Sequence, residues 1–185
     1  MTQLIKPCAE HLSQYVAALK RGWSADNTRG KEAADEELVR ISEDAETYLA
    51  LQDDEEVRGG PIKLPDGSTW PRLPSIKRWI RDGEFCGAIG FRWQNGTDAL
   101  PPHVLGHIGF AVVPWKQRQG HASEALRLML PEARARGLAH VELTTDPDNF
   151  GSQKVMEVNG ARLIGRFQKP EMYGGHEGLL YRIEL

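Results

Sequence analysis

The amino-acid sequence predicts an α/β fold: a mixed, mostly antiparallel central sheet with helices on both faces. Three observations predict it. Apolar residues recur at helical spacing between residues 9 and 49. Two strand-like runs, 75–80 and 85–93, flank a Gly-containing turn, which is typical of an antiparallel hairpin. Beyond residue 104, strand and helix patterns alternate, as in a sheet whose strands are joined by helices.

The first half of the chain predicts one strand and two helices. Residues 3–6 form a short apolar run that Pro7 ends, and a helix is predicted over 9–20. A second helix is predicted to run through residues 34–49, with the acidic residues mostly on its other faces. Residues 58–74 hold four prolines and three glycines, which predicts a long irregular segment near the surface.

The second half predicts alternating strands and helices. Strands are expected at 104–113, 139–145, 162–167 and 179–185. One helix follows Gly120 and ends at Gly137, and a shorter one spans 149–159. Pro131 removes a hydrogen bond inside the longer helix, so we expect a kink in its last turns.

Composition limits the classes of function. The chain has 185 residues, 40% of them hydrophobic and 26% charged, which suits one domain with a sizeable core. Its two cysteines and the lack of a Cys/His cluster at zinc spacing predict neither a disulfide framework nor a metal. The net charge of −3 argues against a nucleic-acid binder. No secretory or 18-residue apolar segment is present, so we expect a cytoplasmic protein that does not bind membranes.

Charge is unevenly distributed along the chain. Eleven acidic residues lie within 31–56, against two basic ones, and the balance reverses within 116–140, where five basic residues oppose two acidic ones. Two interpretations remain open: a solvated acidic helix, or an acidic wall that attracts a cationic substrate opposite a basic patch for a polyanionic cofactor.

The most informative stretch lies between a predicted strand and a predicted helix. The apolar run 107–114 leads into Gln117-Arg118-Gln119-Gly120-His121-Ala122, where the helix begins. The first N–H groups of a helix have no partner within it, and the helix dipole adds partial positive charge there. A strand that turns through small residues into a helix therefore predicts an anion site.

The chain resembles the GNAT superfamily of acyl-coenzyme A-dependent N-acetyltransferases, most strongly over residues 103–164. The pyrophosphate loop of that superfamily is written Q/R-x-x-G-x-G/A, and this pattern is filled by Gln117, Gly120 and Ala122.

The later helix of the superfamily commonly begins with Asn and ends in Gly followed by an aromatic residue. Asn149 and Gly160 match this pattern, whereas Ala161 replaces the aromatic residue. The segment 146–149, with Ser152 and Lys154, is most similar to a subgroup of bacterial acetyltransferases of unassigned substrate.

The resemblance implies one GNAT-like N-acetyltransferase domain over residues 1–185. Residues 1–74 are then the helical, acceptor-side part, and residues 75–185 the acetyl-CoA-binding core. In this arrangement a strand edge pairs with the pantetheine arm, and backbone N–H groups cradle the pyrophosphate, with Arg118 adding a charged contact. The cofactor-binding residues so implied are Phe110, Ala111, Val112, Val113, Gln117, Arg118, Gln119, Gly120, His121, Ala122, Ser123, Asn149 and Ser152. Asn149 also suits a plain helix N-cap, and Ser152 a first-turn residue that satisfies its own backbone.

Acetyl transfer to an amine requires removal of a proton. An alkyl amine with a pKa near 10.4 is mostly protonated at neutral pH, so a base or a water relay is useful. The proposed base is His107, on the strand that leads to the loop, where many superfamily members carry a Glu. The alternative is a structural histidine hydrogen-bonded within the sheet.

The departing thiolate raises a second question. Many superfamily members use a Tyr seven residues after the conserved Asn, and Met156 stands at that position here. Either Tyr173, Tyr181 or Ser152 protonates the sulfur, or no acid is needed because a thiol of pKa near 8.5 is a tolerable leaving group.

The sequence therefore predicts an enzyme that moves an acetyl group from acetyl-CoA to a primary amine of a small molecule or peptide, by direct attack in a ternary complex. The alternatives are a non-catalytic acyl-CoA sensor, suggested by Met156, and an interaction protein that uses its acidic helix. The expected assembly is a monomer or a homodimer. The acidic segment favours a cationic acceptor.

Overall fold

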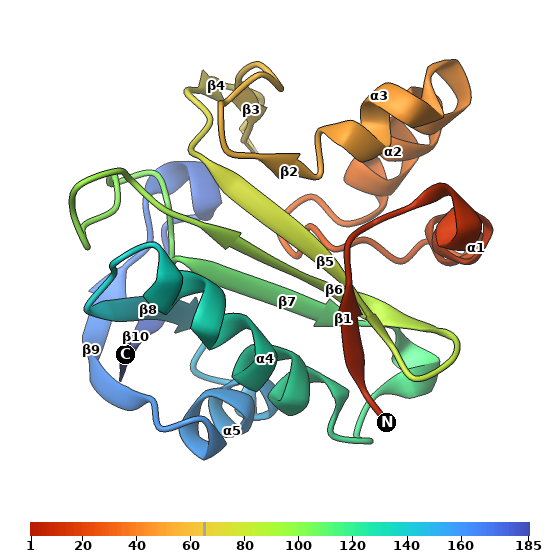
Figure 1. Cartoon of the computed structure of the whole chain (residues 1–185). Coiled ribbons are helices and arrows are strands. Elements are labelled where there is room, and N and C mark those ends of the chain that lie inside the picture. Colours follow the sequence, from red (N-terminus) through yellow and green to blue (C-terminus); the bar gives the residue numbers. More distant parts are fainter. Residues whose placement is uncertain (65) are drawn as a thin grey trace.

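The computed structural model describes residues 1–64 and 66–185, and its main feature is two antiparallel sheets that meet edge to edge with helices on both faces (Figure 1). The first sheet has the order β1-β5-β6-β7, with β2 on the end of β5. Its strands are β1 (Gln3–Ile5), β2 (Asp53–Asp54), β5 (Ser75–Arg81), β6 (Phe85–Arg92) and β7 (Ile108–Val112).

The second sheet has the order β8-β10-β9 and closes the chain. Its strands are β8 (His140–Thr145), β9 (Arg162–Gln168) and β10 (Glu177–Glu184). A separate small hairpin pairs β3 (Ile62–Lys63) with β4 (Thr69–Trp70).

Helices cover both faces of the first sheet. The helices in the described part of the chain are η1 (Ala9–His11), α1 (Leu12–Lys20), α2 (Lys31–Glu43), α3 (Ala45–Ala50), η2 (Pro114–Lys116), α4 (His121–Ala135), α5 (Phe150–Val158) and η3 (Glu171–Tyr173), of which α5 packs against β8 of the second sheet. The α4 side chains pack with Ile80, Ile89 and Phe91 in one core cluster. On the opposite face, α1 packs against Trp79 and Ala88 in a second cluster. The period-2 pattern of β5 and β6 thus sends alternate residues into two cores, and the predicted fold class is confirmed.

The two sheets approach each other at their edge strands β7 and β8, which are not paired as neighbours in one sheet. These neighbouring strands run in the same direction (Figure 1). A hydrogen bond joins the sheets just before β7, where the His107 N–H donates to the Glu142 carbonyl at 2.7 Å. A Cβ on Gly106 would lie 3.0 Å from that carbonyl oxygen and 3.2 Å from the Leu143 Cα. A residue without a side chain is needed there because the two backbones approach so closely.

Most predicted elements are present, and three differ. The predicted helix 34–49 is wrong as one piece: it breaks at Asp44, whose carboxylate accepts from the Thr47 N–H at 2.9 Å and starts α3 as an N-cap. The strand predicted from residue 104 begins only at Ile108, because the backbone before it crosses to β8. The irregular segment 58–74 contains the β3–β4 hairpin, and Pro65 lies outside the described residues. Pro131 lies inside α4, which continues to Ala135.

None of the helices in the described part of the chain has the length and apolar character needed to cross a lipid bilayer.

Candidate active site

A cleft of about 730 Å³ lies on the α1–α2 face of the first sheet and runs to the gap between β7 and β8. One wall comes from α2, α3 and the loop before α2, and the other from β8, α5 and η3. Residues of β5, β6 and β7 also line it. The cleft therefore joins the predicted acceptor-side part to the predicted acetyl-CoA-binding core.

Two glycines stand opposite each other on the part of the sheet that lines the cleft. Gly90 of β6 pairs with Gly109 of β7, and both line the cleft. Arg92 stands on the same face two residues after Gly90, and its Nη2 lies 3.3 Å from where a Cβ on Gly109 would be. Two facing glycines thus create a hollow in the sheet surface, with the Arg92 guanidinium over one side of it. The sequence analysis did not single out Arg92.

Several residues named from the sequence line this cleft. They are Asn149, Ser152 and Met156 at α5, and Tyr173 in η3. The Asn149 side chain accepts from the Ser152 N–H at 3.0 Å, so it caps α5 as well as facing the cleft. Met156 is 1% exposed and belongs to the core cluster under α4.

Tyr173 has the geometry of a hydrogen-bond donor in this cleft. Its hydroxyl donates to the His103 carbonyl at 2.8 Å. Burial raises the pKa of Tyr173 above its ordinary value, so the hydroxyl stays protonated at neutral pH. Tyr181, the other tyrosine considered, is buried in the core beside β8, and the cleft lining does not include it.

The structure does not bring His107 together with Tyr173 and Ser152. His107 is 0% exposed and is not among the residues that line the cleft. Its Nδ1 accepts from the Glu142 N–H at 2.9 Å, and burial lowers the pKa of the imidazole. With its backbone N–H bonded to the same residue, His107 holds the start of β7 against β8. The structure therefore places the His107 ring in the contact between β7 and β8 and outside the cleft lining.

A different histidine, His103, is among the residues that line the cleft. It is 5% exposed and stacks on Trp70 with ring centroids 4.4 Å apart. Both ring nitrogens are buried, and neither has a hydrogen-bond partner in the part of the chain that the structure describes. Sequence reasoning passed over His103 because it lies in a loop, where no periodicity indicates which way a side chain points.

The predicted anion site has the required backbone geometry. Arg118 and Gly120 have φ of 61° and 84°, and this left-handed backbone turns the chain into α4. None of the N–H groups from Arg118 to Ser123 has an acceptor among the described residues. A non-glycine residue in this conformation is strained, and such strain often accompanies a binding site. Consecutive unpaired N–H groups at a helix start form a nest for an anion.

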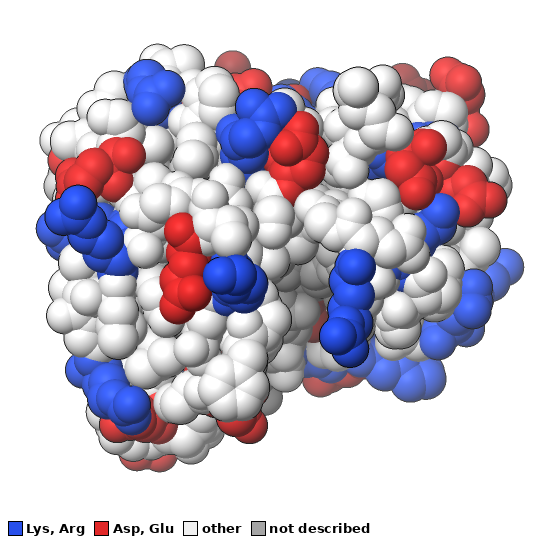
Figure 2. Space-filling model, turned by 90° about the horizontal axis from the view of Figure 1, so that it is seen from below, with Lys and Arg blue, Asp and Glu red and all other residues white. Residues whose placement is uncertain are grey.

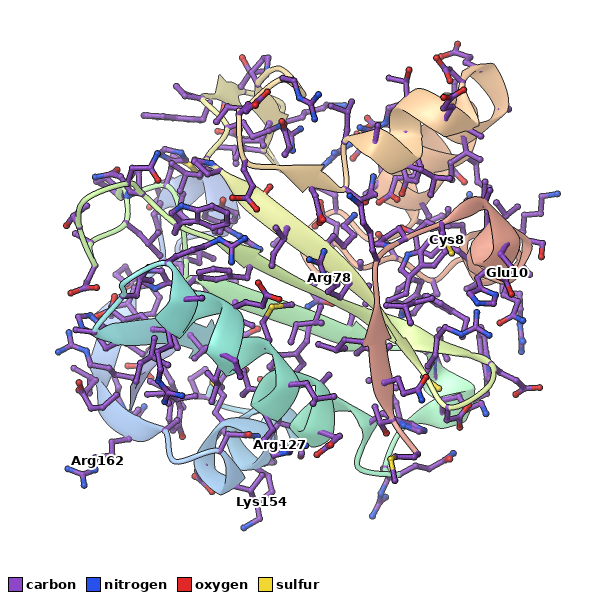
Figure 3. All side chains as sticks on the ribbon, in the orientation of Figure 1. Cys8, Glu10, Arg78, Arg127, Lys154 and Arg162 are labelled. Atoms are coloured by element: carbon purple, nitrogen blue, oxygen red, sulfur yellow. The ribbon has the colours of Figure 1, made fainter. Side chains whose placement is uncertain are left out.

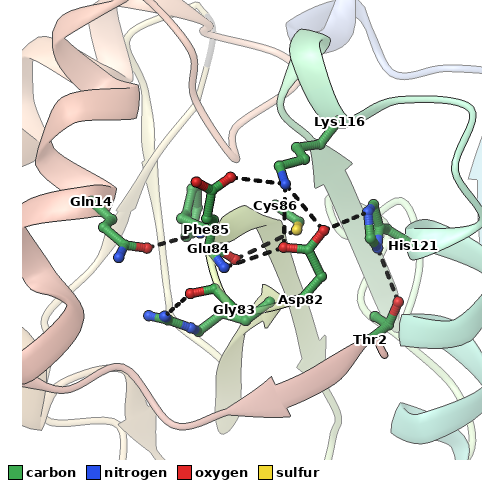
Figure 4. A network of polar contacts seen from close by, with 10 residues as sticks. Thr2, Gln14, Asp82, Gly83, Glu84, Phe85, Cys86, Lys116 and His121 are labelled. Carbon is green, nitrogen blue, oxygen red and sulfur yellow. Dashed lines mark hydrogen bonds and ion pairs between the residues drawn. The ribbon is translucent and has the colours of Figure 1, made fainter.

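Inside this loop His121 turns away from the proposed anion site. Figure 4 shows its imidazole pointing toward Asp82 and Thr2: Nδ1 lies 2.9 Å from the Thr2 hydroxyl, and Nε2 3.5 Å from the Asp82 carboxylate. His121 can therefore contribute only its backbone N–H, and not its imidazole, to the proposed anion site. Asp82 and His121, together with Cys86, offer three metal-type ligand atoms, but Lys116 already lies 3.1 Å from the Asp82 carboxylate. Burial raises the pKa of the Cys86 thiol to about 11, so this network is best described as a brace between the β5–β6 turn and α4.

Strand β7 is the last strand of its sheet, so one of its edges is open toward β8. Two side-chain amides contact carbonyls of this strand: Asn27 donates to Phe110 and Gln117 to Val112, each at 3.3 Å. Both contacts are long for an N–H···O bond and are made by exposed groups. An extended ligand arm can displace them and pair with the edge as an added strand.

Part of the acidic segment is paired with cations. Glu32 and Glu36 pair with Arg29 and Lys63, and the pKa of Glu36 falls to about 2 because of these partners. Seen from below, acidic and basic side chains are interspersed over the surface (Figure 2).

Glu37 of this segment points inward instead and accepts hydrogen bonds from the Tyr15 and Tyr48 hydroxyls. Burial alone would raise the pKa of Glu37, but the nearby Lys77 charge and the two hydroxyls hold it below its ordinary value. This carboxylate therefore stays ionised and is already hydrogen-bonded at one end of the cleft.

Several charged residues near the binding motifs face solvent. Arg127 and Lys154 project outward from α4 and α5, and Arg162 does so at β9 (Figure 3). Lys154, which belongs to the motif shared with the bacterial subgroup, thus points away from the cleft that Ser152 lines.

Comparison with known proteins identifies the family. Residues 37–162 match the model of the acetyltransferase (GNAT) domain. No curated protein matches the chain. Among solved structures, the chain is similar to the microcin C7 self-immunity acetyltransferase MccE, solved with acetyl-CoA and AMP (TM-score 0.66, 13% identity, covering 100% of this chain and 92% of that one).

Two further solved structures have the same fold. One is RimL, a ribosomal L7/L12 alpha-N-protein acetyltransferase solved with coenzyme A (TM-score 0.65, 16% identity, covering 100% of this chain and 94% of that one). The other is Mycobacterium smegmatis RimJ in complex with CoA-disulfide (TM-score 0.64, 18% identity, covering 99% of this chain and 81% of that one). At these identities the likeness establishes the fold.

Proposed function

The chain belongs to the GNAT acetyltransferase family, and on this premise we propose that it transfers an acetyl group from acetyl-CoA to a primary amine of a small molecule or peptide, by direct attack in a ternary complex. The observation that carries the proposal is the continuity of three features. An anion nest at α4 leads to an open strand edge on β7, and this edge leads to a cleft lined by Asn149, Ser152 and Tyr173.

Acetyl-CoA fits this sequence of features. The pyrophosphate binds the N–H groups of Arg118–Ser123, the pantetheine arm pairs with Phe110–Val113, and the thioester reaches Asn149 and Ser152. Support comes from the solved relatives, which were obtained with acetyl-CoA or coenzyme A. Met156 adds an apolar surface beside the thioester, where the superfamily commonly has a tyrosine.

The reaction needs one proton removed and one supplied. The amine loses a proton, its nitrogen attacks the thioester carbonyl carbon, and the tetrahedral intermediate expels the thiolate as the C–S bond breaks. Tyr173 is the candidate that supplies a proton to the sulfur, because its hydroxyl is protonated at neutral pH and it lines the cleft. To do so, the hydroxyl must exchange its hydrogen bond to the His103 carbonyl for one to the sulfur. Ser152 is the second candidate donor. His103 takes the place first given to His107 as the base, because its ring nitrogens are unpartnered in the described residues and it lines the cleft.

Thiol release from acetyl-CoA with a panel of amines tests this function. Turnover that depends on the amine supports the proposal, whereas coenzyme A binding without turnover on any amine favours a sensor. No thermal shift at millimolar coenzyme A would leave the interaction-protein alternative.

The base assignment has its own experiment. We expect His103→Gln to lower kcat/KM by about 100-fold at neutral pH. His11→Gln, which changes a histidine outside the cleft lining, is the matched control and should retain the wild-type kcat/KM. A wild-type kcat/KM in His103→Gln would show that another group or water removes the proton.

A further inference from the structure

The charges that line the cleft are unequally paired. Among the described residues, five acidic and six basic side chains line it. The acidic ones are Asp26, Glu37, Glu43, Asp44 and Asp146, and the basic ones are Arg40, Lys63, Arg72, Lys77, Arg92 and Lys169. The balance between them depends on which charges already have partners.

Four of the five carboxylates accept hydrogen bonds from protein groups. Asp26 accepts from the N–H groups of Thr28 and Arg29, and Asp44 from that of Thr47. The remaining two are Glu37, bonded to two tyrosines, and Asp146, paired with Lys169.

Three of the six cations, by contrast, have no carboxylate within 4.0 Å in the described part of the chain: Arg40, Lys77 and Arg92. Lys63 and Arg72 pair with acidic residues outside the lining, at 2.9 Å from Glu36 and 4.0 Å from Asp54. Hydrogen bonds from neutral groups leave the charges of Asp26, Glu37 and Asp44 in place, so the cleft as a whole carries charges of both signs. Within it, Arg40, Lys77 and Arg92 are the cations without a carboxylate partner among the described residues, and Lys77 and Arg40 act on the ionised Glu37.

Arg92 lies beside the strand that we assign to the pantetheine arm. Its guanidinium lies over Gly109, the residue before the β7 edge that we assign to the pantetheine arm. It donates no hydrogen bond to any described residue, and burial lowers its pKa, with Tyr173 and Asp26 the charged or ionisable groups that offset this. Asp26 cannot serve as a direct partner, because it lies beyond 4.0 Å and one of its oxygens binds its own loop.

A guanidinium in this setting matches one class of ligand. Its planar fork binds carboxylates and phosphates through two parallel N–H···O bonds, and it keeps its charge at any physiological pH. The floor of paired glycines leaves room for the ligand beside it.

We infer that the acceptor amine carries an oxyanion, a carboxylate or a phosphate, and that Arg92 binds it. This inference rests on the proposed acetyl transfer and replaces the cationic acceptor that the acidic segment favoured. Arg92 is then the residue that determines which amines the enzyme accepts.

Matched acceptor pairs test this. Alanine is compared with alaninamide, and phosphoethanolamine with ethanolamine, in wild type, Arg92→Gln and Arg92→Lys. Because the amines within a pair differ in intrinsic reactivity, the measured quantity is the change in the kcat/KM ratio of the pair between protein variants. We expect Arg92→Gln to lower the preference for the anionic member of at least one pair by about 10- to 100-fold, and Arg92→Lys to lower it less. The pair with the larger change identifies carboxylate or phosphate.

Two controls make the result specific. Arg134→Gln changes an exposed α4 arginine outside the cleft lining and should leave both ratios as in wild type. Coenzyme A affinity should be equal in wild type and Arg92→Gln, which shows that the variant folds and that Arg92 does not act through the cofactor. An equal loss on both members of each pair, or no preference in wild type, would overturn the inference.

A binding measurement separates this inference from the proposed function. Saturation-transfer NMR with phosphoethanolamine or alanine, in the presence of coenzyme A, needs no turnover. If no amine is acetylated but one anionic probe binds wild type and not Arg92→Gln, the anion site stands and the transfer reaction fails. If neither probe binds, or both variants bind equally, the anion site itself is refuted.

Discussion

Replacing Gly120 with glutamate introduces a carboxylate where we propose that the pyrophosphate of acetyl-CoA binds. Gly120 precedes α4 with φ of 84°, and no atom lies within 4 Å of where its Cβ would be. The side chain therefore has space, and the cost to the fold is limited to the left-handed backbone. That cost is about 1–2 kcal/mol, which lowers Tm by about 2–8 °C in a domain of this size.

The effect on cofactor binding has a different origin. A carboxylate about 4 Å from a phosphate oxygen repels it by about 1 kcal/mol in water and by about 4 kcal/mol at a partly screened surface. We therefore expect Gly120→Glu to weaken coenzyme A binding by about 5-fold to several hundred-fold. Gly120→Gln has the same size and backbone strain without the charge, so it isolates the electrostatic part.

Calorimetric titration of coenzyme A into the three proteins, at low and high salt, measures both effects. Equal melting temperatures for the two variants and a gap in affinity that narrows with salt support the pyrophosphate loop. Equal affinities of Gly120→Glu and Gly120→Gln at low salt would refute this placement of the phosphates.

Three further changes address other parts of the site. His107→Phe removes the acceptor of the Glu142 N–H and should cost about 1–3 kcal/mol in denaturant unfolding. Burial lowers the pKa of His107 in the folded state below the value of about 6.5 that it has in the unfolded state. Its contribution to stability is therefore complete above about pH 6.5 and is lost as the pH falls. The decline in unfolding free energy between pH 7 and 5 should be shallower in His107→Phe than in wild type. Gly106→Val should weaken coenzyme A binding and lower Tm, because the new side chain meets the β8 backbone; wild-type values for both would contradict the close contact. Tyr173→Phe should lower kcat with acetyl-CoA by about 100-fold, the lower end for a general acid. The loss of kcat should be smaller with a thioester whose thiol is more acidic, because that leaving group needs less help from an acid. An equal loss with both thioesters would point to a structural role.

The fold followed from the sequence where one local pattern determined the outcome. The hairpin at β5–β6, the helix after Gly120 and the Asn149 cap each depend on a few adjacent residues. The break at Asp44 was also encoded locally, as an N-cap inside an apolar repeat, and the stronger periodicity of the helix concealed it.

The candidate site was harder to predict because it depends on contacts between distant segments. His103 and His107 are four residues apart, yet one lines the cleft and the other bonds to β8. Which of the two lines the cleft depends on where the backbone just before β7 bonds to β8, and no local sequence pattern specifies this. Arg92 gave no signal for the same reason: its importance lies in the absence of a partner among the described residues, and partners come from elsewhere in the chain.

The acidic segment 31–56 was also hard to interpret from the sequence, because the partners of its charges lie elsewhere in the chain. The acidic segment suggested an attraction for cations, but a potential depends on charges that remain after pairing. Glu36 lies 2.6 Å from Arg29 and 2.9 Å from Lys63, so these charges largely cancel at the distance of a ligand in the cleft. The Arg92 guanidinium has no carboxylate partner among the described residues, and it lies beside Gly109 on the sheet, where water screens a charge less than at an open surface. We therefore expect Arg92 to govern the field close to β7 more than the exposed carboxylates of the segment do.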